Sequence, residues 1–199
     1  MGISSPLLKQ AGFVKRKIAI AIAIEWVAEL DGLGQQWNLS SRIATDEGDY
    51  FEIDYIAGEF LGSLGAYKRF LGSDDNYGVN VTTSSIAWEF SVVGTVATLN
   101  GENIITSSDI PQDSLARTLK VTPTQSTTIQ SIGGLSTVGN RSVNAAIFNF
   151  RHYNSDGFLI HEIPLTSKEQ GATQLATVGN INAFMTNYTK AVWKDRAKL

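Results

Sequence analysis

Hydrophobic and polar residues alternate along residues 146–165, AIFNFRHYNSDGFLIHEIPL, and this period of two is typical of β-strands. The alternation places Phe148 and Phe150 on one face of the first strand. Asp156-Gly157 supplies the small residues that a short hairpin connection needs, and Pro164, which cannot donate a ladder hydrogen bond, indicates a strand end. The segment therefore predicts a β-hairpin.

The same alternation recurs about every 10 to 12 residues, with turn signals between the runs. Asn100-Gly101 is the strongest of these signals, because both residues tolerate positive φ. No window of residues 44–165 keeps a helical period with capping residues. The further strands that we expect are at residues 13–30, 37–41, 50–60, 67–71, 77–82, 86–91, 92–99 and 115–122.

These strands predict an all-β protein, an antiparallel two-sheet sandwich of the jelly-roll kind. We expect one sandwich domain at residues 18–199, preceded by a short N-terminal arm at residues 1–17 that contains Pro6 and many small residues. A chain of 199 residues fits this organisation, because β-sandwiches of about 200 residues often form one domain.

Composition excludes several classes of function. Charged residues are 18% and the formal net charge is −3, so the chain lacks the basic surface that nucleic acid requires. The absence of cysteine removes disulfides, thiolate metal sites and cysteine nucleophiles. Stability must therefore come from packing and from sheet hydrogen bonds.

Residues 15–24, KRKIAIAIAI, combine a basic start with an apolar run, which is also the pattern of a secretory signal. The strict alternation of Ile and Ala favours a strand instead, and the run is much shorter than the roughly 20 residues that cross a bilayer. We expect a strand at residues 18–24 and no membrane insertion. Its flat apolar edge would risk uncontrolled strand pairing unless its own sheet or a neighbouring subunit covers it.

Four segments of the chain carry a resemblance to a known family. In chain order they are WNLSSRIATDEGDYFEIDYIAGEF, RFLGSDDNYGVNV, TVATLNGENI, and AIFNFRHYNSDGFLIHEIPL with the tail EQGATQLATVGNINAFMTNYTKAVW. They resemble, in the family's order, the laminin-G-like or concanavalin-like jelly rolls, especially those of structural proteins in bacteriophage particles. The likeness covers roughly residues 26–193 and leaves the N-terminal arm outside.

This resemblance implies a non-enzymatic structural protein on the surface of a bacteriophage-like virion, as a capsid decoration or a component of a tail or fibre. Its partners would be other virion proteins and copies of itself. The alternative is an adhesion module that recognises a host surface glycan. The residues that we expect to make the assembly contact are Leu7, Leu8, Phe13, Ile18, Ile20, Ile22 and Ile24.

Two groups of residues beside turns are candidate binding sites. Tyr67, Tyr77 and Trp88 could form an aromatic platform for sugar rings. The resemblance implies calcium near a sheet rim, and Asp74, Asp75 and Asn76 offer oxygen ligands on one turn. An ordinary Asx turn explains these three residues equally well, so we expect no cofactor, with calcium as the alternative left open.

Glu52-Ile53-Asp54 is the one motif that suggests a glycosidase, since some members of the fold class carry paired carboxylates on a core strand. Glu59 is an odd number of residues from Glu52 and would point to the opposite face of a regular strand. We therefore expect no enzyme, and a solvated polar face at Glu52 and Asp54. His152 and His161 could meet across the hairpin, and we expect packed or hydrogen-bonded histidines rather than a metal site.

Overall fold

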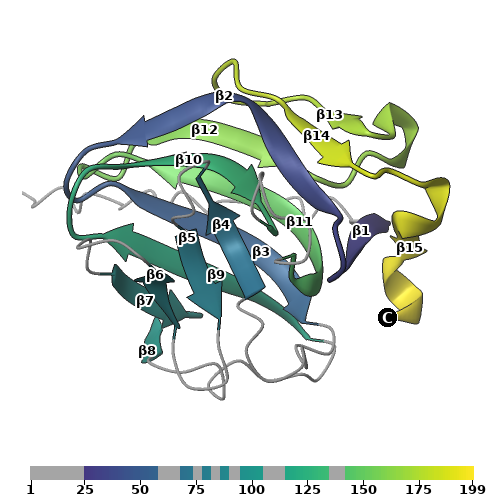
Figure 1. Ribbon diagram of the computed structural model, residues 1–199, viewed down its shortest axis with the longest axis horizontal. Coiled ribbons are helices and arrows are strands. Elements are labelled where there is room, and N and C mark those ends of the chain that lie inside the picture. The colour runs from purple at the N-terminus through teal and green to yellow at the C-terminus, as the bar shows by residue number, and fades with distance from the viewer. Residues whose placement is uncertain are drawn as a thin grey trace, which may run out of the picture.

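The computed structural model describes residues 25–57, 68–73, 78–81, 86–89, 95–104, 115–134 and 142–199, and these residues form two β-sheets (Figure 1). Every strand pair in the two sheets is antiparallel, and the helical elements in these ranges are three-residue 3-10 turns near the C-terminus. The predicted all-β, two-sheet architecture is confirmed. The jelly-roll connection of its strands stays a prediction.

The first sheet has eight strands, and β11 forms its centre. Its order is β15 (Trp193–Asp195), β1 (Trp26–Asp31), β11 (Asn144–Tyr153), β3 (Tyr50–Ala57), β9 (Ala116–Pro123), β7 (Thr95–Leu99) and β8 (Glu102–Ile104). The eighth strand, β12 (Leu159–Pro164), also pairs with β11. The first half of β11 pairs with β1 and the second half with β12, so these two strands share one edge of β11.

The second sheet has seven strands, in the order β13 (Thr173–Gln174), β14 (Ala183–Thr186), β2 (Gln36–Thr45), β10 (Thr127–Ile132), β4 (Lys68–Gly72), β5 (Gly78–Val81) and β6 (Ile86–Glu89). The 3-10 turns are η3 (Lys168–Gln170), η4 (Lys190–Val192) and η5 (Arg196–Lys198). Figure 1 shows the C-terminal segment, which contains η4, β15 and η5, at one end of the molecule beside β1.

One hydrophobic core joins the two sheets, and period-two alternation supplies it. On β3 the side chains of Phe51, Ile53 and Tyr55 are completely buried, while Glu52 and Asp54 between them are only partly buried. β2 contributes Trp37 from the other sheet, also with no exposed surface. Apolar side chains of both sheets therefore meet in one interior, as expected for a sandwich.

The hairpin of β11 and β12 is confirmed, and its loop spans residues 154–158. The backbone N–H of Gly157 donates to the carbonyl of Asn154 at 2.9 Å, and Gly157 has a φ of 82°, which favours glycine. The Asn154 side chain accepts from the N–H of Phe158 at 2.8 Å. Pro164 is the last residue of β12, as its missing N–H predicts.

The predicted common face of Phe148 and Phe150 is wrong, because β11 contains a bulge. Ile147 lies opposite Tyr55 and Asn149 lies opposite Asp54, so Phe148 is an extra residue relative to β3. Phe150 packs in the main core, whereas Phe148 belongs to a separate buried cluster. The other members of that cluster are Val27, Ile56 and Ala146.

The turn predictions agree with the structure where they can be compared. Asn100 and Gly101, with φ of 50° and 92°, connect β7 to β8, and β1 ends at Asp31. The strand predicted at residues 37–41 continues to Thr45 as β2, past an exposed stretch at residues 40–42 that hides its pattern. The arm at residues 1–17 and the strand predicted at residues 18–24 lie outside the described residues.

Candidate functional site

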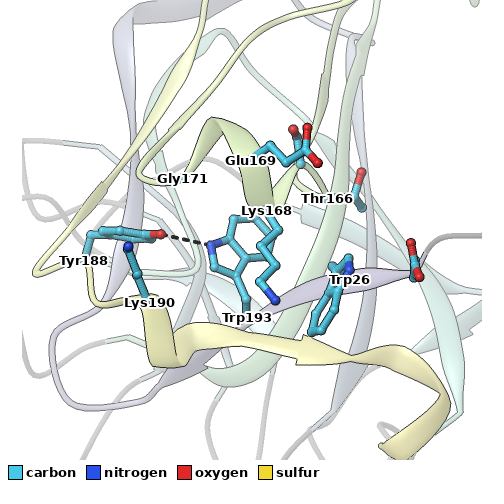
Figure 2. A pocket seen from close by; sticks show the side chains of 10 residues that line it. Trp26, Thr166, Lys168, Glu169, Gly171, Tyr188, Lys190 and Trp193 are labelled. Atoms are coloured by element: carbon cyan, nitrogen blue, oxygen red, sulfur yellow. Dashed lines mark hydrogen bonds between the residues drawn. The ribbon is translucent and has the colours of Figure 1, made fainter.

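A pocket of about 890 Å³ lies at the end of the sandwich where β1, η3 and the C-terminal segment meet (Figure 2). Its volume falls within the range of small-ligand sites, roughly 300 to 1,000 Å³. Residues distant in sequence line it, because β1 and β15 are neighbours in the sheet. The lining residues are Glu25, Trp26, Thr166, Ser167, Lys168, Glu169, Gly171, Tyr188, Lys190 and Trp193.

Aromatic side chains form one wall of the pocket. Trp26 and Tyr188 are partly buried against the hydrophobic core, and Trp193, at 6% exposure, belongs to it. The indole N–H of Trp193 donates to the hydroxyl oxygen of Tyr188 at 3.2 Å, drawn as the dashed line in Figure 2. This bond holds the hydroxyl oxygen of Tyr188 in the pocket. The hydroxyl hydrogen of Tyr188 can then be donated to a ligand.

Lys168 reaches across the pocket from the first position of η3. Its ammonium nitrogen lies 3.3 Å from the ring centroid of Trp26, which is a cation–π contact (Figure 2). The side chain of Ser167 caps η3 by accepting from the N–H of Gln170 at 3.4 Å. The position of Lys168 thus depends on a short capped turn.

Gln174 on β13 holds that turn in place. Its side chain is completely buried, and its amide nitrogen donates to the carbonyls of Ser167 at 2.8 Å and Gly171 at 3.1 Å. Its amide oxygen accepts from the N–H of Ser167 at 2.9 Å. A single buried side chain therefore ties both ends of the segment that carries Lys168 to the second sheet.

The polar face of the first sheet carries an ion-pair network around Arg151. Its guanidinium donates to both carboxylate oxygens of Asp54, at 2.6 and 2.9 Å, and to Glu52 at 3.1 Å. Burial alone would lower the pKa of Arg151, but the hydrogen bond to Asp54 and the charges of Asp54 and Glu52 raise it above its usual value. Both carboxylates of the suspected glycosidase motif are thus engaged by one arginine.

The two histidines lie side by side inside the hairpin. His152 is 3% exposed, stacks on Phe51 with ring centroids 5.0 Å apart, and faces His161 and Asp49. Burial is the main cause that lowers the pKa of both imidazoles. They are packed and hydrogen-bonded, as expected. Among the residues that the structure describes, no three His, Asp or Glu side chains group closely enough to hold a metal ion.

Most of the site residues predicted from the sequence lie outside the described ranges, so those predictions stay predictions. Trp88 is a residue of β6, where its backbone pairs with Val79. The others are the sugar candidates Tyr67 and Tyr77, the calcium candidates Asp74, Asp75 and Asn76, and the assembly residues Leu7, Leu8, Phe13, Ile18, Ile20, Ile22 and Ile24. Glu59 also falls outside these ranges.

The pocket itself was not predicted. Trp26 and Trp193 are more than 160 residues apart, and the antiparallel pairing of β1 with β15 brings them together. The available signal was the local mixture of aromatic and charged residues, Glu25-Trp26 at one end and residues 188–193 at the other. The sequence alone does not show that these two segments lie close together, because that depends on the order of the strands in the sheet.

Comparison with known proteins found no family model, no curated protein and no solved structure that matches the chain. The likeness to laminin-G-like phage proteins therefore stays a prediction from the sequence. The described ranges contain no helix with the length and apolar character needed to span a membrane.

Proposed function

We propose that the protein is a non-enzymatic β-sandwich module that binds carbohydrate in the pocket beside Trp26, and that it does so on the surface of a bacteriophage-like virion. The observation that carries this proposal is the composition of the pocket wall. Aromatic side chains lie there beside hydroxyl, ammonium and carboxylate groups, all within one cavity at the end of the sandwich.

Sugars present hydroxyl groups that both donate and accept hydrogen bonds, together with small apolar patches of C–H groups. The pocket offers matching groups: the Tyr188 hydroxyl and the Lys168 and Lys190 ammoniums donate, and the Glu25 and Glu169 carboxylates accept. The partly buried aromatic wall provides the apolar contact. A few convergent polar groups in a mostly apolar cavity are the usual features of a ligand site.

The non-enzymatic part of the proposal is supported by the ion pairs around Arg151. Glycoside cleavage needs one carboxylic acid and one free carboxylate that face the same sugar. Glu52 and Asp54 both accept hydrogen bonds from Arg151, so neither carboxylate is free of protein partners to face a sugar. If the protein were instead an endoglycosidase, incubation with polysaccharides would release fragments, and Glu52→Gln would abolish the release.

A glycan array followed by calorimetric titration tests the binding function. Trp26→Ala is expected to weaken the affinity for the best array ligand by about tenfold or more, because the indole that forms part of the pocket wall and supports Lys168 is lost. Phe184→Ala is the matched control, since Phe184 is an exposed aromatic residue that does not line the pocket. Absence of glycan binding by the unmodified protein, or equal losses in both variants, would overturn the proposed site.

The alternative sugar platform is tested with the same array. If Tyr67, Tyr77 and Trp88 bind the glycan, their alanine variants lose affinity while Trp26→Ala does not. Calcium held by Asp74, Asp75 and Asn76 would appear as an affinity that falls when a chelator is added and returns with calcium.

The virion setting is supported by the family resemblance and by the sequence of residues 1–24, which predicts an arm followed by an apolar strand. Its proposed partners are other capsid or tail proteins and copies of this chain. Deletion of residues 1–17 is expected to reduce association with particles while the sandwich stays folded. A host-glycan adhesion module without a particle is the alternative, and it predicts full glycan binding with no particle association in either form.

A further inference from the structure

We propose that the ligand of the pocket is an acidic glycan whose carboxylate binds the ammonium group of Lys168, an inference that rests on the carbohydrate-binding function proposed above. In this arrangement Lys168 is the residue that determines specificity, and Trp26 serves chiefly as the support that holds its charge in position.

The contact between Lys168 and Trp26 argues against recognition by stacking alone. A sugar ring stacks on an indole with carbon atoms about 3.5 to 4 Å above the ring. The Lys168 nitrogen already occupies that space, 3.3 Å from the Trp26 centroid. Trp193 is 6% exposed and so has almost no free face to offer. The pocket therefore presents a positioned cation where a neutral-sugar site would present an open aromatic face.

The ammonium of Lys168 also has unused donors. A cation–π contact engages its charge but none of its three N–H groups. Within the part of the chain that the structure describes, no carboxylate lies within 4 Å of the ammonium of Lys168 or Lys190, although Lys194 and Lys198 do form ion pairs. The nearby charge of Asp195 acts on Lys168 from beyond that distance, and Asp195 itself pairs with Lys198. A carboxylate is the group that best satisfies an ammonium, because the hydrogen bond between them is charge-assisted.

The acidic residues of the pocket do not already fill this role. Figure 2 shows the carboxylate of Glu169 on the side of the turn away from the Lys168 ammonium, which points down between Trp193 and Trp26. The ammonium of Lys190 lies beside Tyr188 in the same view. Both Glu25 and Glu169 line the pocket, where their carboxylates can accept from hydroxyl groups of the sugar while the carboxylate of the ligand pairs with lysine.

The test is an array of matched pairs, in which each uronic-acid or sialic-acid glycan is printed beside its carboxyl-reduced neutral counterpart. We expect the unmodified protein to bind acidic members, with at least about a tenfold preference over their reduced partners. Equal binding of both members would overturn the acidic-glycan inference and leave the carbohydrate-binding function intact. Binding to no glycan on the array would overturn the proposed function itself.

The variant Lys168→Met identifies the residue responsible, because methionine keeps an apolar side chain over Trp26 and removes the charge. We expect it to lose the preference for acidic members and to retain its thermal melting temperature. Lys194→Met is the control, since Lys194 is a partly exposed lysine outside the pocket that pairs with Glu29. A preference that survives Lys168→Met, or that is lost equally in both variants, would contradict the role of Lys168.

Discussion

His152 on β11 lies directly opposite His161 on β12, and their Nδ1 atoms are 3.1 Å apart. One of these nitrogens must donate and the other accept, so a single hydrogen lies between them. The Nε2 atom of His152 is 3.3 Å from a carboxylate oxygen of Asp49, which accepts only. The consistent arrangement has His161 donating to His152 and His152 donating to Asp49, with both imidazoles neutral.

This histidine pair predicts that acid destabilises the protein. Burial lowers the pKa of both imidazoles below its usual value of about 6.5, so around and below that pH the unfolded chain binds more protons than the folded chain. The free energy of unfolding is therefore expected to fall as the pH drops from about 7 to about 5.5, a range above the usual titration of carboxylates. Urea unfolding at several pH values measures this slope.

The chain contains only two histidines, so one substitution tests the cause. His161→Gln can still donate to His152 through its amide, but it does not titrate. We expect this variant to show a shallower decline of stability between about pH 7 and 5.5. An unchanged slope would mean that other groups produce the pH dependence.

Arg151 neutralises two carboxylates, and its removal is expected to be costly. Arg151→Met would remove the guanidinium that pairs with both Glu52 and Asp54 on the same face of β3, although both carboxylates are partly exposed to water. We expect a loss of about 2 kcal/mol in the free energy of unfolding, between the values for surface and buried ion pairs. Chemical denaturation at neutral pH measures it.

A second substitution separates charge from packing. Asp54→Asn in the Arg151→Met background removes one of the stranded carboxylates, so it is expected to recover part of the lost stability. If the two substitutions instead add their separate costs, the ion pair makes no net contribution and the loss comes from packing alone.

The hairpin could be predicted from its sequence because its determinants are local. Alternation, Asp156-Gly157 and Pro164 all act within a few residues of one another. The bulge at Phe148 could not, because it arises where β11 leaves β1 and pairs with β12 while β3 continues along its other edge. A slip of one residue between neighbouring strands depends on partners that a single segment does not reveal.

The ligand pocket illustrates the same limit for function. Aromatic residues beside turns were the natural candidates for a sugar platform, since turns lie on the surface. Trp26 and Tyr188 line one pocket because β1 and β15 are adjacent and because Gln174 holds the η3 turn beside them. Both conditions are tertiary, and neither follows from spacing in the sequence.

Replacing Gly133 with a larger residue is expected to destabilise the fold for two reasons. Its φ is 77°, and an added Cβ would lie 2.3 Å from a methyl carbon of the buried Leu30. We expect Gly133→Ala to cost about 3 kcal/mol, from left-handed backbone strain together with overpacking. Gly101→Ala provides the control, because Gly101 has a φ of 92° and no atom within 4 Å of an added Cβ. That variant is expected to lose only about 1 kcal/mol, and equal losses in a thermal unfolding comparison would remove the packing argument.

Gln174 connects the stability of the η3 turn to ligand binding. Gln174→Met fills a similar volume but removes the hydrogen bonds to Ser167 and Gly171, so partly buried backbone groups lose their partners. We expect a loss of about 2 kcal/mol in stability and faster amide hydrogen exchange in residues 166–171. Because this turn carries Lys168, the affinity for the best glycan of the array should fall even at temperatures where the variant is fully folded.

Ser131→Ala distinguishes this local effect from general destabilisation. The Ser131 hydroxyl is buried and donates to the carbonyl of Gly134 at 2.7 Å, and neither residue lines the pocket. Its loss is expected to lower stability by about 1 kcal/mol without changing exchange in residues 166–171 or glycan affinity. If Gln174→Met lowers stability and leaves both of these readouts unchanged, Gln174 contributes to the fold but does not position Lys168.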